Sequence, residues 1–165
     1  MPEQPIDLEK LAEAIQRQYE KGQPLQSLAP NHRRAWEIIY YQAHQFYKFE
    51  RYKQAEDLFT LLCMSDPKQE RYWLGLGLAQ HRQQRYAEAL QAYSEAINTG
   101  GDNPWCALHS AECHLKTNAY ESARNALNVA EIWARGDEDI GALTVRIAGL
   151  RKILERRMAK QSSAN

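Results

Sequence analysis

The side chains best suited to chemistry gather in one short segment that contains Cys106, His109, Cys113 and His114. At about 100° per residue, a helix places Cys106, His109 and Cys113 on one face, where thiolate and imidazole ligands could meet a metal ion. However, ligands from one short helix converge poorly on a tetrahedron, and the chain has no second Cys/His pair elsewhere. We therefore expect no metal site and no cofactor.

The same segment also raises the possibility of a cysteine nucleophile, because Glu112 and His114 flank Cys113. Neighbours in sequence point to different sides of a helix, so neither can serve as the base that activates a thiol. No phosphate-binding loop or oxyanion device is present either. We expect no catalytic residue, and we interpret the thiols as small apolar groups that pack in a core.

The overall composition limits the class of partner. The chain has 165 residues with 21 Lys and Arg against 21 Asp and Glu, so no global field favours nucleic acid or a membrane surface. It lacks a run of about 18 apolar residues and an N-terminal signal peptide. The number of cysteines is three, and an odd number cannot all pair within the chain as disulfides. These features predict a cytoplasmic protein with no nucleic-acid partner and no membrane insertion.

The elements that must position any site follow a repeat. Tyr, Ala, a large apolar residue and a small or apolar residue recur at a step of 34 residues, which is the tetratricopeptide period. The three registers are Tyr52, Ala55, Phe59 and Leu62; Tyr86, Ala89, Tyr93 and Ala96; and Tyr120, Ala123, Leu127 and Ala130. The small residues let two antiparallel helices approach closely, and the large ones fill the gap that remains.

Short polar segments at 49–51, 83–85 and 117–119 predict the turns inside each helix pair. Two further helix starts are predicted where a capping side chain precedes proline, at Asp66 with Pro67 and at Asn103 with Pro104.

The chain therefore predicts an all-α tetratricopeptide-repeat solenoid of three helix pairs. Residues 1–33 form an N-terminal helix (about 8–21, capped by Asp7 and Gly22) and a linker. Residues 34–136 form the three repeats, and residues 137–165 form a capping helix with a frayed basic tail that we interpret as a solvated face.

The concave face is the candidate binding surface. The first helix of each unit lines the inner wall of such a superhelix, through its positions 2, 5, 9 and 12. An exposed apolar patch there normally marks a binding site, and Leu74 and Leu78 are at its centre. For Trp105 and Leu115, at the edge, packing under other segments is equally compatible with the sequence. The predicted groove residues are Tyr40, His44, Tyr47, Leu74, Leu78, His81, Trp105, Leu108 and Glu112.

Four segments, 55–63, 72–77, 86–93 and above all 109–115, resemble the class II chaperones of bacterial type III secretion systems, which escort hydrophobic translocator proteins. This resemblance implies a cytosolic, non-enzymatic chaperone that holds an extended, proline-containing translocator segment in its groove and self-associates as a homodimer through its N-terminal region. The resemblance also implies that five of these positions match groove residues of the family, namely Tyr40, Tyr47, Leu74, Leu78 and Trp105. His44 and Trp105 depart from the family's usual pattern, so the pockets nearest them suit a different side chain.

Two other functions remain open from the sequence. A general adaptor that grips the C-terminal carboxylate of a partner needs inward Lys, Arg and Asn side chains, whereas the wall positions here are mostly apolar. A structural subunit whose groove is filled by its own chain is the second alternative.

Overall fold

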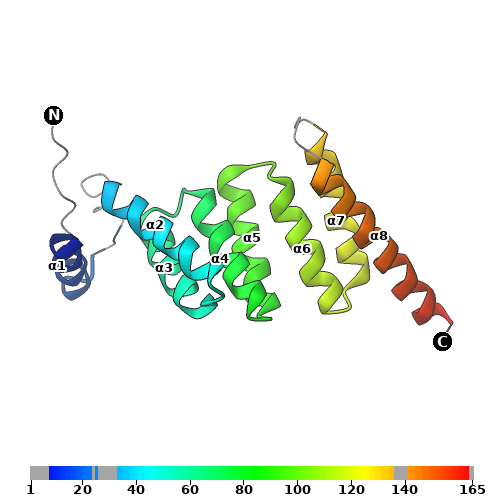
Figure 1. Cartoon of the computed structure of the whole chain (residues 1–165), viewed down its shortest axis with the longest axis horizontal. Helices are drawn as coiled ribbons and strands as arrows, with labels where there is room; N and C mark the ends of the chain where they lie inside the picture. The colour runs from blue at the N-terminus through cyan, green and yellow to red at the C-terminus, as the bar shows by residue number, and fades with distance from the viewer. Residues whose placement is uncertain (1–7, 24, 26–32, 136–140, 164–165) are drawn as a thin grey trace.

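The computed structural model describes residues 8–23, 25, 33–135 and 141–163, and the regular elements within these ranges are helices. In Figure 1 they follow one another along an elongated solenoid, with α1 at one end and α8 at the other. This confirms the all-α repeat fold. The helices are α1 (Leu8–Glu20), α2 (Arg33–Lys48), α3 (Tyr52–Ser65), α4 (Glu70–Arg82), α5 (Tyr86–Gly100), α6 (Pro104–Lys116), α7 (Tyr120–Ala134) and α8 (Gly141–Ser162).

The helices form two layers. Each helix from α2 onward packs on the next, as helix pairs in a solenoid do. In addition, α2 contacts α4, α4 contacts α6 and α6 contacts α8, whereas the described residues of α3, α5 and α7 form no comparable contacts with one another. The layer of α2, α4, α6 and α8 is therefore the more closely spaced, and the solenoid curves toward it.

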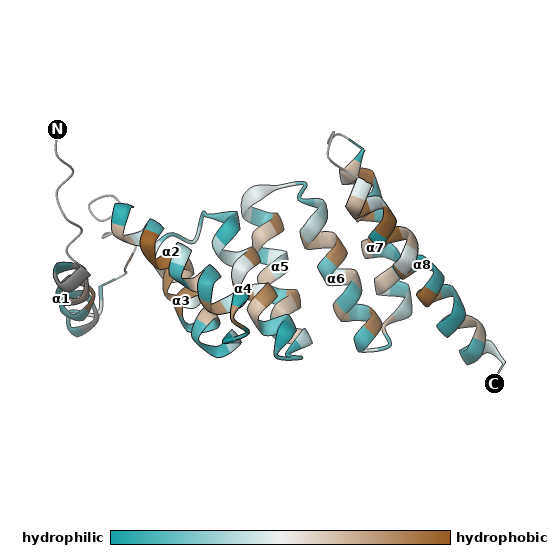
Figure 2. Cartoon of the chain, viewed as in Figure 1, coloured by the Kyte–Doolittle hydropathy of each residue, from teal (hydrophilic) through white to brown (hydrophobic). Residues whose placement is uncertain are grey.

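Close approach of paired helices depends on small residues. Apolar and polar residues alternate along each repeat helix (Figure 2), and the alanines at the repeat positions, such as Ala55, Ala89 and Ala123, are fully buried. A Cβ added to Gly77 would lie 2.5 Å from the ring of Tyr93, and one added to Gly75 would clash with the ring of Phe59. Both glycines of α4 thus make room for an aromatic ring of a partner helix.

The three turns inside the helix pairs lie at 49–51, 83–85 and 117–119, as the sequence predicts. The middle residue of each turn adopts a left-handed conformation without being glycine, with φ of 59° at Glu50, 62° at Gln84 and 59° at Asn118. The repeat therefore imposes the same backbone at the same position every 34 residues, whatever the side chain.

Of the two helix starts predicted where a capping residue precedes proline, the structure confirms one and contradicts the other. At Asn103 the prediction is correct, because its side chain accepts a hydrogen bond from the Trp105 amide at 2.9 Å with Pro104 in the first turn. At Asp66 it is wrong, because α4 begins only at Glu70 and Asp66 follows the end of α3. The Asp66 carboxylate instead accepts hydrogen bonds from the Lys68 amide and the Gln69 side chain, which stabilises a turn between the helices.

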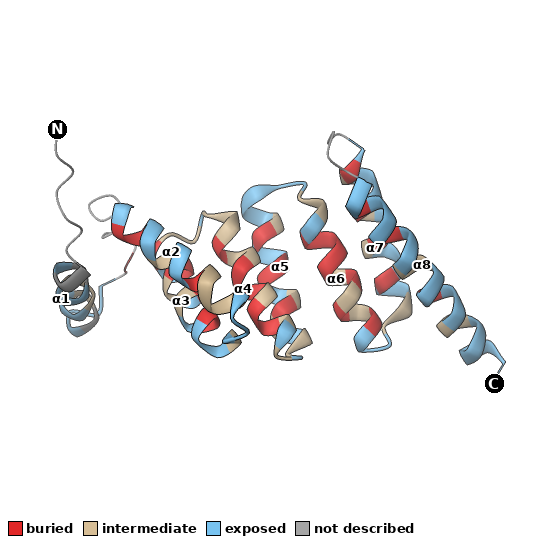
Figure 3. Cartoon of the chain, in the orientation of Figure 1, coloured by how far each residue is buried: buried red, intermediate tan, exposed pale blue. Residues whose placement is uncertain are grey.

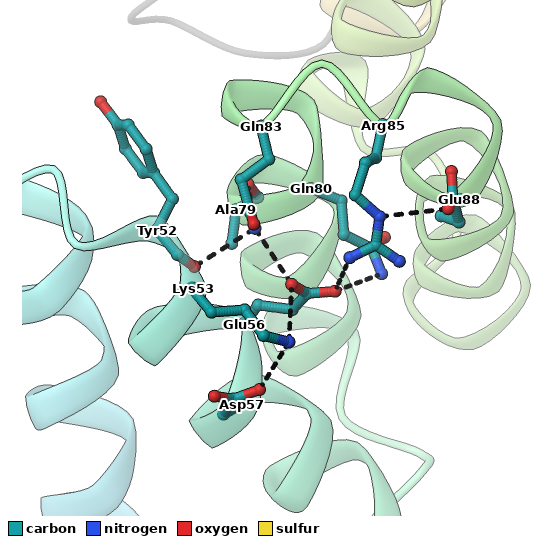
Figure 4. Close-up of polar contacts among 9 residues, drawn as sticks. All are labelled: Tyr52, Lys53, Glu56, Asp57, Ala79, Gln80, Gln83, Arg85 and Glu88. Carbon is teal, nitrogen blue, oxygen red and sulfur yellow. Dashed lines mark hydrogen bonds and ion pairs between the residues drawn. The ribbon is translucent and has the colours of Figure 1, made fainter.

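A buried carboxylate fixes the second repeat onto the first (Figure 4). Glu56 of α3 accepts hydrogen bonds from Gln80 and Gln83 and forms ion pairs with Arg85 and Lys53. Its side chain is 7% exposed, so these partners replace the water that the carboxylate loses on folding. The turn at 83–85 is thereby held against α3.

The two ends are less buried than the centre (Figure 3). Among its described side chains, α1 packs on the first repeat through Ala14 and Ile15, and Gly22 after it has the left-handed φ of 62° expected of a helix cap. α8 covers the third repeat with Leu143, Ile147 and Leu154 and continues through Gln161. No helix in the described ranges is both long and apolar enough to cross a membrane.

Candidate functional site

The predicted groove residues of α2 and α4 line the concave layer together. Tyr40, His44 and Tyr47 on α2 and Leu74, Leu78 and His81 on α4 are all half-buried. A half-buried side chain of this size touches its neighbours and still offers part of its surface to solvent. The wall of the first two repeats is therefore partly open and largely apolar or aromatic.

Tyr40 is the centre of an aromatic cluster at the start of this wall. Its ring centroid lies 4.6 Å from that of His44 and 5.6 Å from that of Tyr72. The Arg71 guanidinium lies 4.5 Å above the Tyr40 ring and also forms an ion pair with Glu37 of α2. Burial raises the pKa of the Tyr40 hydroxyl, so the phenol is neutral at physiological pH.

Leu74 and Leu78 occupy the middle of the wall. Both pack against a small core made of Ala89, Tyr93 and Cys113, so one side of each leucine is anchored. The other side of each leucine remains partly open to solvent.

The third repeat contributes differently from the prediction. Leu108, which the repeat register places on the wall, is fully buried in the core beneath α7 and α8 and is not a surface residue. The capping helix covers it, because α8 packs in the place of a fourth inner helix. Trp105 is 39% exposed, and its ring stacks on His109 with a centroid distance of 6.2 Å. Leu115 packs under α8.

A polar cluster occupies the wall between the second and third repeats. Nδ1 of His109 donates to Oε2 of Glu112 at 3.0 Å, and Arg146 of α8 donates to Oε1 of Glu112 at 2.7 Å. Nδ1 of His81 lies 3.3 Å from the hydroxyl oxygen of Tyr93. Burial lowers the pKa of His81, which is therefore neutral at physiological pH.

Sequence reasoning missed the parts that His109, Tyr93 and Arg146 play in this cluster. One signal was available, because Glu112 and Arg146 stand 34 residues apart, as Glu37 and Arg71 do. Opposite charges at one repeat position in successive units face each other across neighbouring inner helices.

Tyr47 is held neutral by its surroundings on the wall. Burial raises the pKa of its hydroxyl, and the opposing charges of Arg82 and Glu112 also act on it.

The cysteines lie away from this surface. Cys63, Cys106 and Cys113 are free and buried, and burial raises the pKa of each thiol to about 12. A thiol in that state is a poor nucleophile and a poor metal ligand at neutral pH. The proposed one-helix cluster of Cys106, His109 and Cys113 therefore does not present its thiols to the groove.

Comparison with known proteins identifies the class. Models described as tetratricopeptide repeat match residues 40–104 and 80–147, which together span well over half of the chain. The chain belongs to the tetratricopeptide-repeat proteins. Within this class it is a relative of the translocator chaperones of type III secretion, as the following similarities show.

The low calcium response locus protein H of Yersinia pestis is 26% identical over 114 residues, which cover 69% of this chain and 68% of the relative. PcrH, whose structure was solved in complex with the chaperone binding region of PopD, is 28% identical to this chain in sequence. The two structures superpose with a TM-score of 0.73, and the match covers 76% of this chain and 95% of PcrH. A chain in a type III secretion complex from Aeromonas hydrophila shares the fold, with a TM-score of 0.77 at 23% identity over 88% of this chain and 97% of that one.

Proposed function

We propose that this protein is a chaperone that binds an extended segment of a hydrophobic type III secretion translocator in its concave groove and keeps the translocator soluble until secretion. The observation that carries the proposal is that Tyr40 and Tyr47 of α2 and Leu74 and Leu78 of α4, two inner helices in contact with each other, are all half-buried apolar or aromatic side chains. Solved relatives support it, since PcrH is seen with the chaperone binding regions of PopD and of PopB.

The shape of the groove favours a short extended ligand. A folded translocator is too large to enter between short helices, whereas an extended segment can place apolar side chains in the wall and leave its backbone hydrated. Prolines in such a segment reduce the conformational entropy that is lost on ordering. The main contacts are proposed between the first and second repeats, and Leu108 no longer belongs to the site.

The charges of the wall argue against the carboxylate-gripping adaptor. Such a site needs free cations that point inward. Here Arg71 is engaged by Glu37, and Arg146 is engaged by Glu112. A carboxylate in the groove would meet paired arginines and apolar side chains, so the adaptor function finds no support at the wall.

The proposal also includes where the protein acts and whether it self-associates. We infer that the protein acts in the bacterial cytoplasm without catalysing a reaction, since its thiols are buried and its relatives are chaperones. Self-association through residues 1–33 belongs to the same proposal, and a dimer is described for the Yersinia enterocolitica chaperone SycD.

Calorimetric titration with peptides of about ten residues tiled along a translocator tests the binding mode. Replacing both Tyr40 and Tyr47 with Ala should weaken the best peptide tenfold or more, because aromatic anchors dominate such interfaces. Trp105→Ala should weaken it less. Tyr41→Ala is the matched control, because Tyr41 lies on the same helix but is 65% exposed.

Helical content and melting temperature of each variant show whether the fold survives. Affinity that persists without Tyr40 and Tyr47 but is lost with Trp105 would move the site to the third repeat. Absence of binding by the unmodified chain to every peptide would reject the chaperone function.

A further inference from the structure

We propose that His81 of α4 and His109 and Glu112 of α6 form a binding site for a divalent metal ion of the zinc class on the groove wall between the second and third repeats. Within the described residues, these three side chains bring one ligand atom each to within 4.8 Å of the other two. They come from two repeats, so the objection to a site made from one helix does not apply to them.

The ligand set matches the chemistry of zinc. Two imidazoles and one carboxylate occur in open zinc sites, where a water or another group takes the fourth position. With metal–ligand bonds of about 2.0–2.1 Å, ligand atoms in a tetrahedron lie about 3.4 Å apart, so these side chains need to move inward by about an ångström. His109 and Glu112 stand three residues apart on one helix, a spacing that helical metal sites use.

The ligands are in the protonation states that a metal needs. Burial lowers the pKa of His81, so its imidazole is neutral at physiological pH. Burial opposes ionisation of Glu112, but hydrogen bonding to His109 and the nearby charges of His109 and Arg146 hold its pKa below the ordinary value. The Glu112 carboxylate is therefore ionised.

Outer contacts already hold the ligands in place. The Tyr93 hydroxyl lies against His81, and Arg146 binds Oε1 of Glu112 through two nitrogens at 3.0 and 2.7 Å. Oε2 accepts from Nδ1 of His109, and an ion bound between these two atoms would take the place of that proton, which is released to solvent. Trp105 stacks on the ring of His109. Contacts of this kind from residues around a metal site fix the orientation of its ligands. The positive charge of Arg146 opposes the ion, so we expect micromolar rather than nanomolar affinity.

A bound ion would tie α4 to α6 and present its open position to the groove. The open position could accept a water molecule or a ligand side chain from a bound peptide. The site itself does not depend on the chaperone function, so the two proposals can fail separately.

The test uses the full-length chain without a polyhistidine tag, freed of metals by a chelator. Zn²⁺ alone is titrated by calorimetry, and Co²⁺ is titrated by visible absorption, which reports nitrogen ligands and a low coordination number. We expect one ion per chain. His81→Ala and Glu112→Gln should each weaken binding at least tenfold, and Zn²⁺ should raise the melting temperature of the unmodified chain more than that of either variant.

Two matched controls separate this site from others. His114→Ala removes the histidine that neighbours the cluster in sequence, and His44→Ala removes the groove histidine of the first repeat; neither should change the affinity. Circular dichroism confirms that each variant is folded. No binding at millimolar Zn²⁺, or equal affinity in all variants, would overturn the site and leave the cluster an ion-pair network only.

Discussion

Glu56 shows how a single residue can connect two repeats at a cost that its partners offset. Burial alone would raise its pKa, but hydrogen bonds from Gln83, Arg85 and Gln80, together with the charge of Arg85, hold the pKa below its ordinary value. The ionised form is therefore favoured in the folded state. The stability that it contributes is present above the unfolded pKa of about 4.3 and is lost as the pH falls through the folded value.

Glu56→Gln should accordingly lower the free energy of unfolding at pH 7 by about 1–3 kcal/mol, the cost of leaving buried polar groups poorly paired. Below pH 4 the difference from the unmodified chain should narrow, because the carboxylate is then being protonated. Urea denaturation at the two pH values measures both effects.

Asp57→Asn provides the control, since Asp57 is 61% exposed and pairs with Lys53 at the surface. It should change stability by no more than about 0.5 kcal/mol. A Glu56→Gln effect that stays constant with pH would contradict the assigned role of the charge.

At the scale of elements, the turns define the repeat as much as the helices do. Each turn forces a non-glycine residue into the left-handed region, which costs of order 1–3 kcal/mol for ordinary side chains. Asn118 carries the smallest cost of the three, because Asn tolerates this conformation better than Glu or Gln. The packing of the helix pair fixes the turn despite the strain.

Gln84→Gly should therefore stabilise the protein by about 1 kcal/mol, because glycine adopts this conformation without strain. Part of the gain is lost, because glycine also increases the conformational entropy of the unfolded chain. Thermal melting measures the shift. Gln83→Gly, one residue earlier, should destabilise it, because φ at Gln83 is −84° and its side chain donates to Glu56. If both substitutions lowered the melting temperature equally, strain at Gln84 would not be the cause.

At the scale of the whole molecule, the two ends of the solenoid are covered by different helices, α8 at one end and α1 at the other. α8 buries Leu143, Ile147 and Leu154 against the third repeat and so closes that end. Among its described side chains, α1 packs on the first core cluster through Ala14 and Ile15. The self-association proposed above places a second copy of the chain at this N-terminal end.

Ala12→Glu should weaken the self-association proposed for residues 1–33, because Ala12 is exposed on the apolar stripe of α1 and a charge there would have to be desolvated in a dimer. Light scattering coupled to size exclusion measures the mass. Glu13→Gln, exposed beside it, should leave the mass unchanged. Equal masses for all three proteins would place any self-association elsewhere.

The sequence by itself determined the period, the turns and the identity of the inner helices. These follow from local rules, because a 34-residue step of small and large residues permits one way of stacking helix pairs. The positions of Tyr40, Tyr47, Leu74 and Leu78 on the inner helices could be predicted for the same reason, since they depend on helix position alone, and the contact of these side chains with a client stays a prediction.

Only the tertiary structure decided what happens where elements from different units meet. Leu108 occupies a wall position and is nevertheless buried, because α8 lies over it. Asp66 has the sequence of a helix cap, yet the connection it stabilises lets α4 begin three residues after Pro67. His81, His109 and Glu112 come together because the curvature of the solenoid, a sum of many packing contacts that no short stretch of sequence encodes, sets the distance between successive inner helices.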